Sequence, residues 1–355
     1  MRIASSFISS SNPSAMKIRL LLIKLALFSI PFVLFLSLYI YWDPFKVIHH
    51  YDHYYTSGTP SYISLNRDYV STETWISQYP RYQYDSYIFG NSRSKFYQVA
   101  TWSRYIGTDS SHCYHFDGSA ESIFGIAGKL KLMDARNVRI KNAIFVIDNG
   151  ALNKADNSAG HIFVKDPRVS GESELAFQVD FMKDFFDFDF LRAYSDFKLS
   201  GKIKDYMTKD FLLDDRPFYY DSITNELKLS SIEALIQKDT GAYYGPRSRF
   251  FFHRDTSVQQ VYPAVIKKAQ LQLLQEIQRK LQKDGTSYRF VISPLYDQKK
   301  LNPADVHVLD SLFGKENVFD FSGINSFTRS RYNYYESSHY RPFIADSIMK
   351  IVYAH

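Results

Sequence analysis

Residues Tyr87–Phe96 read YIFGNSRSKF, and this stretch indicates both a fold and a site. A short apolar run ends abruptly at Gly90 and is followed by small polar residues. Such runs are typical of buried strands, and glycine followed by asparagine favours a tight turn. Ser92 would then stand at the carboxyl end of a strand, where open parallel sheets bind their ligands. Taken alone, Ser92 fits better as the N-cap of a helix.

The rest of the chain repeats this alternation of short apolar runs and helical stretches. The predicted strands are Ser86–Phe89, Cys113–Phe116, Ala143–Ile147, Tyr288–Ile292 and Val318–Phe319. The predicted helices are Ile123–Asp134, Ser257–Lys283 and Phe343–Tyr353. Strands that alternate with helices favour a three-layer α/β/α domain with a mostly parallel sheet, which we expect over residues 84–355. Residues 155–255 break the rhythm and are interpreted as an insertion, a helical cap beside a substrate groove.

The N-terminal region predicts a membrane anchor. The apolar run from Leu20 to Trp42 is long enough to cross a hydrocarbon core of about 30 Å. Lys17 and Arg19 precede this run, so the positive-inside rule predicts a cytoplasmic tail over residues 1–19. A transmembrane helix over 20–42 and a juxtamembrane stalk over 43–83 would follow, with the remaining chain on the far side of a bacterial cytoplasmic membrane. The alternative is a cleaved signal peptide.

Composition narrows the class of protein. The chain has 43 Lys and Arg against 37 Asp and Glu, a net charge of +6 without a long basic block, which argues against a nucleic-acid partner. Cys113 is the single cysteine, so the chain forms no internal disulfide and no cysteine-based metal cluster. His49, His50 and His53 have a spacing that suits a metal, but a solvated stalk explains them better.

A histidine that could activate Ser92 stands out near the C-terminus. His339 lies in the polar stretch ESSHYRP, just before the last predicted helix, and Glu336 precedes it by three residues. A carboxylate at that spacing can reach imidazole Nδ1 and leave Nε2 free to face a serine. A serine hydroxyl needs such a base before it becomes a nucleophile.

Taken together, these two blocks resemble the SGNH (GDSL-like) hydrolase superfamily. Gly90-Asn91-Ser92 is similar to its nucleophile block, and Glu336-Ser-Ser-His339 is similar to its Asp-x-x-His block, with glutamate in place of aspartate. The forms of the two blocks in this chain, Gly90-Asn91-Ser92-Arg93 and Ser338-His339-Tyr340-Arg341-Pro342, resemble those of its membrane-anchored envelope branch, which is related to polysaccharide O-acetyltransferase proteins. The resemblance implies Ser92 as nucleophile, His339 as base and Glu336 as the residue that orients it.

The resemblance also implies an oxyanion hole. Its backbone donor would be Ala120, in a segment where the family usually has glycine, and its side-chain donor would be Asn149, in an Asp-Asn-Gly stretch that lacks the family's first glycine. The implied fold is SGNH or flavodoxin-like. The implied activity is that of a serine esterase or O-acyltransferase on a glycan ester, with no cofactor or metal. Implied partners are a glycan, the membrane and a membrane acyl-donor protein. The alternative is a degenerate SGNH fold that binds glycan or scaffolds an export complex.

Overall fold

The computed structural model describes residues 13–55, 61–214, 219–228 and 230–354. The chain divides into two compact units, Met1–His49 and His50–His355. In the first unit, helix α1 covers Pro13–Trp42, and its stretch Met16–Trp42 is long and apolar enough to cross a membrane. Residues 1–12 of the predicted cytoplasmic tail lie outside the described residues. Such a helix fits either a signal anchor or a signal sequence.

The second unit is built on a sheet of five parallel strands in the order β2-β1-β3-β6-β7. The strands are β1 Ser86–Gly90, β2 Cys113–Asp117, β3 Asn142–Ile147, β6 Ser287–Ile292 and β7 Val318–Asp320. The predicted α/β class and parallel sheet are thereby confirmed. From β1 the chain passes outward to β2 and then returns to β3 on the other side of β1. The order therefore reverses between β1 and β3, the position at which open α/β sheets form a crevice.

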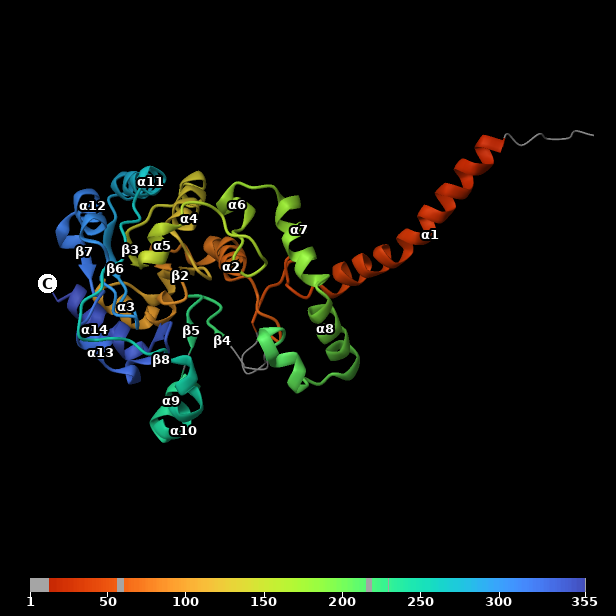
Figure 1. The fold of residues 1–355 in the computed structure, drawn as a ribbon. Helices are drawn as coiled ribbons and strands as arrows, with labels where there is room; N and C mark the ends of the chain where they lie inside the picture. Colours follow the sequence, from red (N-terminus) through yellow and green to blue (C-terminus); the bar gives the residue numbers. More distant parts are fainter. Residues whose placement is uncertain (1–12, 56–60, 215–218, 229, 355) are drawn as a thin grey trace, which may run out of the picture. The chain divides into compact units, whose positions relative to one another are not determined.

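Alternate side chains of each strand point to opposite faces of the sheet, and helices cover both faces. Phe89 and Phe145 face one hydrophobic core, and Ile88 and Ile144 face a second core. On the first face lie α2 Arg67–Tyr82, α4 Ile123–Ala135, α11 Lys268–Asp284 and α12 Pro303–Phe313. On the second lie α3 Val99–Tyr105 and α14 Pro342–Val352. Figure 1 shows the two sets of helices on either side of the strands.

Two predicted boundaries differ from the structure. Residues 43–83 were expected to form a stalk, but α2 packs on the first face with Trp75 fully buried. The helix predicted from Ser257 begins at Lys268 instead. Pro263 lacks a backbone N–H and cannot sit inside a regular helix. The chain before Lys268 pairs with a loop, and Tyr262 N–H donates to the Lys300 carbonyl at 2.9 Å.

The segment between β3 and α11 is long and mostly helical. It contains α5 Asn149–Asn153, α6 Pro167–Ser170, α7 Glu174–Phe185, α8 Phe188–Ser200, the strand pair β4 Tyr219–Tyr220 and β5 Leu227–Lys228, then α9 Ser230–Lys238 and α10 Thr240–Arg247. Phe177, Phe181 and Phe185 are the buried residues of α7. Tyr243 and Tyr244 of α10 join the second core, so α10 packs near the C-terminal part of the chain.

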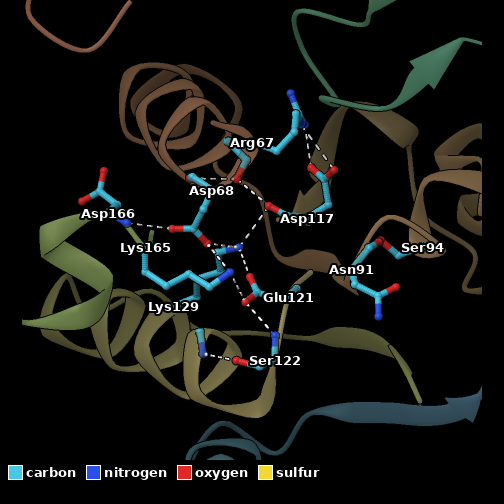
Figure 2. Close-up of polar contacts among 12 residues, drawn as sticks. Arg67, Asp68, Asn91, Ser94, Asp117, Glu121, Ser122, Lys129, Lys165 and Asp166 are labelled. Carbon is cyan, nitrogen blue, oxygen red and sulfur yellow. Dashed lines mark hydrogen bonds and ion pairs between the residues drawn. The ribbon is translucent and has the colours of Figure 1, made fainter. Parts of the chain in front are cut away.

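A buried ionic cluster fills the space between α2, α4 and the loop after β2 (Figure 2). Asp68, Glu121, Lys129 and Lys165 form this cluster, and none is more than 1% exposed. Lys129 Nζ lies 3.0 Å from an Asp68 oxygen and also contacts Glu121, while Lys165 Nζ lies 2.8 Å from Glu121. Burial alone would lower the pKa of Lys129, but the two carboxylates outweigh it and raise that pKa. We call these four residues the buried ionic cluster.

Candidate active site

Ser92 follows β1 in a turn that requires glycine at its entry. A Cβ on Gly90 would lie 2.6 Å from the Val146 carbonyl oxygen and 2.8 Å from Ser94 Cβ, so a side chain there would collide with β3. The Asn91 side chain accepts a hydrogen bond from Arg93 N–H at 3.0 Å, which fixes the turn around Ser92. The sequence therefore presents the Ser92 hydroxyl at the carboxyl end of a central strand.

Behind this turn lies a second, fully buried serine and histidine pair. The Ser94 hydroxyl donates to the Asn91 carbonyl at 2.7 Å and lies 3.0 Å from His115 Nε2. Because the hydroxyl already donates, it accepts from the imidazole, which assigns the proton to Nε2 of a neutral ring. Burial lowers the pKa of His115 to about 4. This pair supports the turn from inside and has no access to solvent.

His339 reaches Ser92 from a short antiparallel pair, β8 Tyr334–Glu336 and β9 His339–Tyr340. We call residues 334–340 the histidine hairpin. His339 Nε2 lies 2.8 Å from Ser92 Oγ, although the two residues are 247 positions apart. His339 Nδ1 contacts the Glu336 carboxylate. With a proton on Nδ1 shared with Glu336, Nε2 is free to accept the Ser92 proton, which is the arrangement of an acid, a base and a nucleophile.

The Glu336 carboxylate is held in its ionised form. Burial would raise its pKa, but the hydrogen bond to His339, that imidazole's charge and a 2.7 Å hydrogen bond from Ser338 N–H together lower the pKa. The side chains of Glu336 and His339 are both 32% exposed, so they can meet a substrate. The extra methylene of glutamate does not prevent contact with the imidazole.

An arginine ties the nucleophile turn to the histidine hairpin. Arg93 Nη1 lies 2.8 Å from the Asp148 carboxylate at the end of β3, and Arg93 Nε donates to the Ser338 carbonyl at 3.1 Å. The same Asp148 oxygen accepts from Asn91 Nδ2 at 2.6 Å. Asp148 therefore fixes residues on both sides of Ser92. The local sequence gives no sign of this partner for Arg93, because Asp148 follows the neighbouring strand β3.

The two predicted oxyanion donors lie just after strands β2 and β3. Ala120 lies in the turn after β2 with φ of 46°, a left-handed conformation that glycine normally supplies, and its side chain is exposed. Asn149 begins α5, and its buried Nδ2 has no hydrogen-bond partner. Their roles stay predictions.

The histidine hairpin is also braced by the segment before α11. Arg341 pairs with Glu233 of α9, with Nη2 at 2.5 Å, and Tyr335 OH donates to the same carboxylate at 2.6 Å. Tyr244 OH of α10 donates to the Tyr334 carbonyl at 2.7 Å. No local pattern indicates this bracing, because Glu233 and Tyr244 both come from the segment that breaks the strand–helix alternation.

Comparison with known proteins finds no family model that matches the chain and no curated protein with significant similarity to it. Across the described residues, no three or more His, Cys, Asp or Glu side chains come together as potential metal ligands. The arrangement of Ser92, His339 and Glu336 is therefore the feature from which a function can be argued.

Proposed function

We propose that this chain is a membrane-anchored serine esterase or O-acyltransferase of the SGNH type that acts on acyl esters of an envelope or secreted glycan. The observation that carries the proposal is the 2.8 Å contact between Ser92 Oγ and His339 Nε2, with Glu336 on the other imidazole nitrogen. Three side chains in these roles, at the carboxyl edge of a parallel sheet, suit attack on an ester carbonyl.

The fold supports the SGNH type. The serine follows the first strand of the sheet, and the histidine hairpin directly precedes the last helix, α14. Five parallel strands with helices on both faces fit a three-layer, flavodoxin-like domain. In this interpretation, residues 155–255 are an insertion on that domain.

The proposed reaction has two steps. Ser92 Oγ attacks the ester carbonyl carbon while its proton passes to His339 Nε2, and Glu336 stabilises the resulting imidazolium. His339 then gives the proton to the sugar oxygen as the C–O bond breaks, which leaves an acyl group on Ser92. Water or a second sugar hydroxyl loses its proton to His339 and attacks the acyl carbonyl carbon. The bond from that carbon to Ser92 Oγ then breaks, and His339 returns the proton to Oγ, which regenerates the serine. Water makes the enzyme an esterase, and a sugar makes it an acyltransferase.

The membrane assignment rests on α1. A long apolar helix preceded by Lys17 and Arg19 supports a signal anchor with a cytoplasmic N-terminus and a domain beyond the bacterial cytoplasmic membrane. Protease treatment of spheroplasts tests this topology. We expect degradation of the domain in intact spheroplasts, and protection until lysis would place the domain in the cytoplasm.

A fluorophosphonate probe tests the catalytic proposal on the full chain in detergent. We expect covalent labelling that Ser92→Ala abolishes, because the probe reacts with an activated serine hydroxyl. Ser111→Ala is the matched control, since Ser111 lies in a surface turn before β2 and should leave labelling unchanged. A folded wild-type chain that is not labelled would contradict the serine mechanism.

A second candidate is a catalytically inactive SGNH-type protein that binds glycan or scaffolds an export complex. The observation that favours it is the left-handed φ of 46° at Ala120, because a turn that glycine normally forms is less suited to present a backbone oxyanion donor when alanine occupies it. Oxyanion donors are worth about 10²–10³ in rate, so a site without them would be slow. Glycan binding without probe labelling would support this candidate.

A further inference from the structure

Four arginines beside the histidine hairpin have no carboxylate partner. They are Arg247, Arg249, Arg254 and Arg331, and we call them the arginine surface. Among the described residues, no carboxylate lies within ion-pair distance of any of them. Arg93 and Arg341 differ, since each is paired with a carboxylate at 2.8 Å or less. The arginines inside the site are neutralised, whereas those around it are not.

Aromatic rings hold these guanidinium groups in place. Arg247 lies 4.2 Å from the centre of the Tyr243 ring, and Arg254 lies 3.8 Å from that of Tyr296. Arg249 and Arg331 lie over Phe250 and Tyr332 at 4.9 and 5.0 Å. A guanidinium held against a ring loses little further freedom when it binds a ligand.

The arginine surface adjoins the site directly. Ser337 N–H, two residues from His339, donates to the Phe250 carbonyl at 3.3 Å. Arg254 Nη2 donates to the Arg329 carbonyl at 2.8 Å, which joins the stretch after α10 to the chain that leads into β8. Phe250, Phe252 and Tyr332 are 45%, 50% and 45% exposed, so large rings lie open between the charges.

We propose that the arginine surface binds an acidic polysaccharide chain, one that carries uronate carboxylates, and leads its ester to Ser92. This inference rests on the proposed function and names its substrate class. Guanidinium groups bind carboxylates through paired hydrogen bonds, and exposed rings offer apolar faces to the C–H groups of sugars. A neutral glycan would leave four unpaired cations unused.

Binding of polygalacturonate to the full chain in detergent tests this proposal. The variant Arg247→Gln/Arg249→Gln/Arg331→Gln removes three charges and keeps Arg254, whose hydrogen bonds to backbone carbonyls are structural. We expect affinity to fall about tenfold or more, since each exposed charge contact contributes modestly. The matched control removes three exposed arginines elsewhere, Arg81, Arg104 and Arg279, and should bind as the wild type does.

Three further binding measurements test whether the arginine surface is specific for an acidic polysaccharide. Neutral dextran should bind at least tenfold more weakly than polygalacturonate, and equal binding would overturn the role of charge. Single-stranded RNA that binds as tightly as polygalacturonate would make the surface a general polyanion site and overturn the proposal. Equal losses in both triple variants would also overturn it. Probe labelling of Ser92 should persist in the triple variant, so failure of this inference is distinguishable from failure of the catalytic proposal.

Discussion

Two polar groups lie near the same edge of the sheet and differ in exposure. The buried ionic cluster follows β2 and is closed, with every charge within 4 Å of an opposite charge and no side chain more than 1% exposed. The site follows β1, and its His339 and Glu336 side chains are each 32% exposed. Figure 2 shows the carboxylates of Asp68 and Glu121 in contact with Lys129, Lys165 and the backbone N–H groups of Asp166 and Ser122.

The difference indicates which polar residues stabilise the fold and which are available for chemistry. Buried charges are tolerated only when they are paired, and a paired and inaccessible lysine cannot meet a substrate. The Ser92 hydroxyl instead lies 2.8 Å from the His339 imidazole, and the serine is only partly buried. The comparison therefore predicts large losses of activity with small losses of stability at the site, and the reverse in the buried ionic cluster.

Removal of the base should have the largest effect. We expect His339→Gln to lower ester turnover by about 10⁴-fold or more, because Ser92 then has no proton acceptor. Thermal stability should change little, since the side chain is partly exposed. Turnover of 4-nitrophenyl acetate and a melting curve measure the two effects, with the exposed His112→Gln as control. Turnover above a tenth of the wild-type value would argue against His339 as base.

Lys129→Met should produce the opposite result. It leaves Asp68 and Glu121 buried with Lys165 as their remaining cation, and breaking a buried pair costs about 3–5 kcal/mol. Urea unfolding of the full chain in detergent measures the change in the free energy of unfolding.

Two further variants assign the cause of this loss. Lys283→Met removes a lysine that is 65% exposed and paired with Asp134 at 2.7 Å, and should cost much less stability than Lys129→Met because solvent screens an exposed pair. Lys129→Met/Glu121→Gln removes one of the unpaired charges and should recover part of the stability. If the double variant is no more stable than Lys129→Met, lost packing rather than unpaired charge explains the effect.

The sheet and the pairing of Ser92 with His339 could be anticipated from local patterns. Apolar runs bounded by polar residues gave strand ends within a residue of those in β1 and β3. Position before the last helix singled out His339 among ten histidines. These features depend on residues close in sequence or on a simple order of elements.

The remaining features depend on contacts between distant segments. Lys129 lies in the middle of α4, where a lysine is usually exposed, so no local pattern indicates that it is fully buried. Residues 43–83 were predicted to form a stalk because their many polar residues gave no sign that Trp75 is fully buried against the sheet. Arg93 and Asp148 meet only because β1 and β3 are neighbours in the sheet.

The buried His115 predicts a dependence of stability on pH. Its pKa falls from 6.5 to about 4 on folding, so the unfolded chain takes up a proton at a higher pH than the folded chain does. The contribution is fully present above pH 6.5 and is lost as the pH falls to about 4. The loss amounts to about 3 kcal/mol at 1.36 kcal/mol per pKa unit. Asp117, Arg67, Lys95 and Lys129 are the charged groups that act on the ring.

Unfolding of His115→Gln between pH 6.5 and 4 measures this contribution. We expect a flatter dependence of the free energy of unfolding on pH than in the wild type, because glutamine takes up no proton. His112→Gln lies on the surface and should follow the wild-type curve. An unchanged slope in His115→Gln would mean that another group controls acid stability.

The smallest expected effect is a loss of activity on removal of Arg93, which joins the nucleophile turn to the histidine hairpin. Arg93→Gln removes the link between Asp148 and the Ser338 carbonyl, so His339 is no longer held at hydrogen-bond distance from Ser92. A displacement of about 1 Å costs about 10²-fold in rate, and we expect this loss in kcat with KM nearly unchanged. Arg93→Lys should recover part of it, because an ammonium can still pair with Asp148. Arg341→Gln, which loosens the same hairpin from α9, should cost less than Arg93→Gln. If kcat is unchanged in Arg93→Gln, the hairpin is held by α9 and α10 alone.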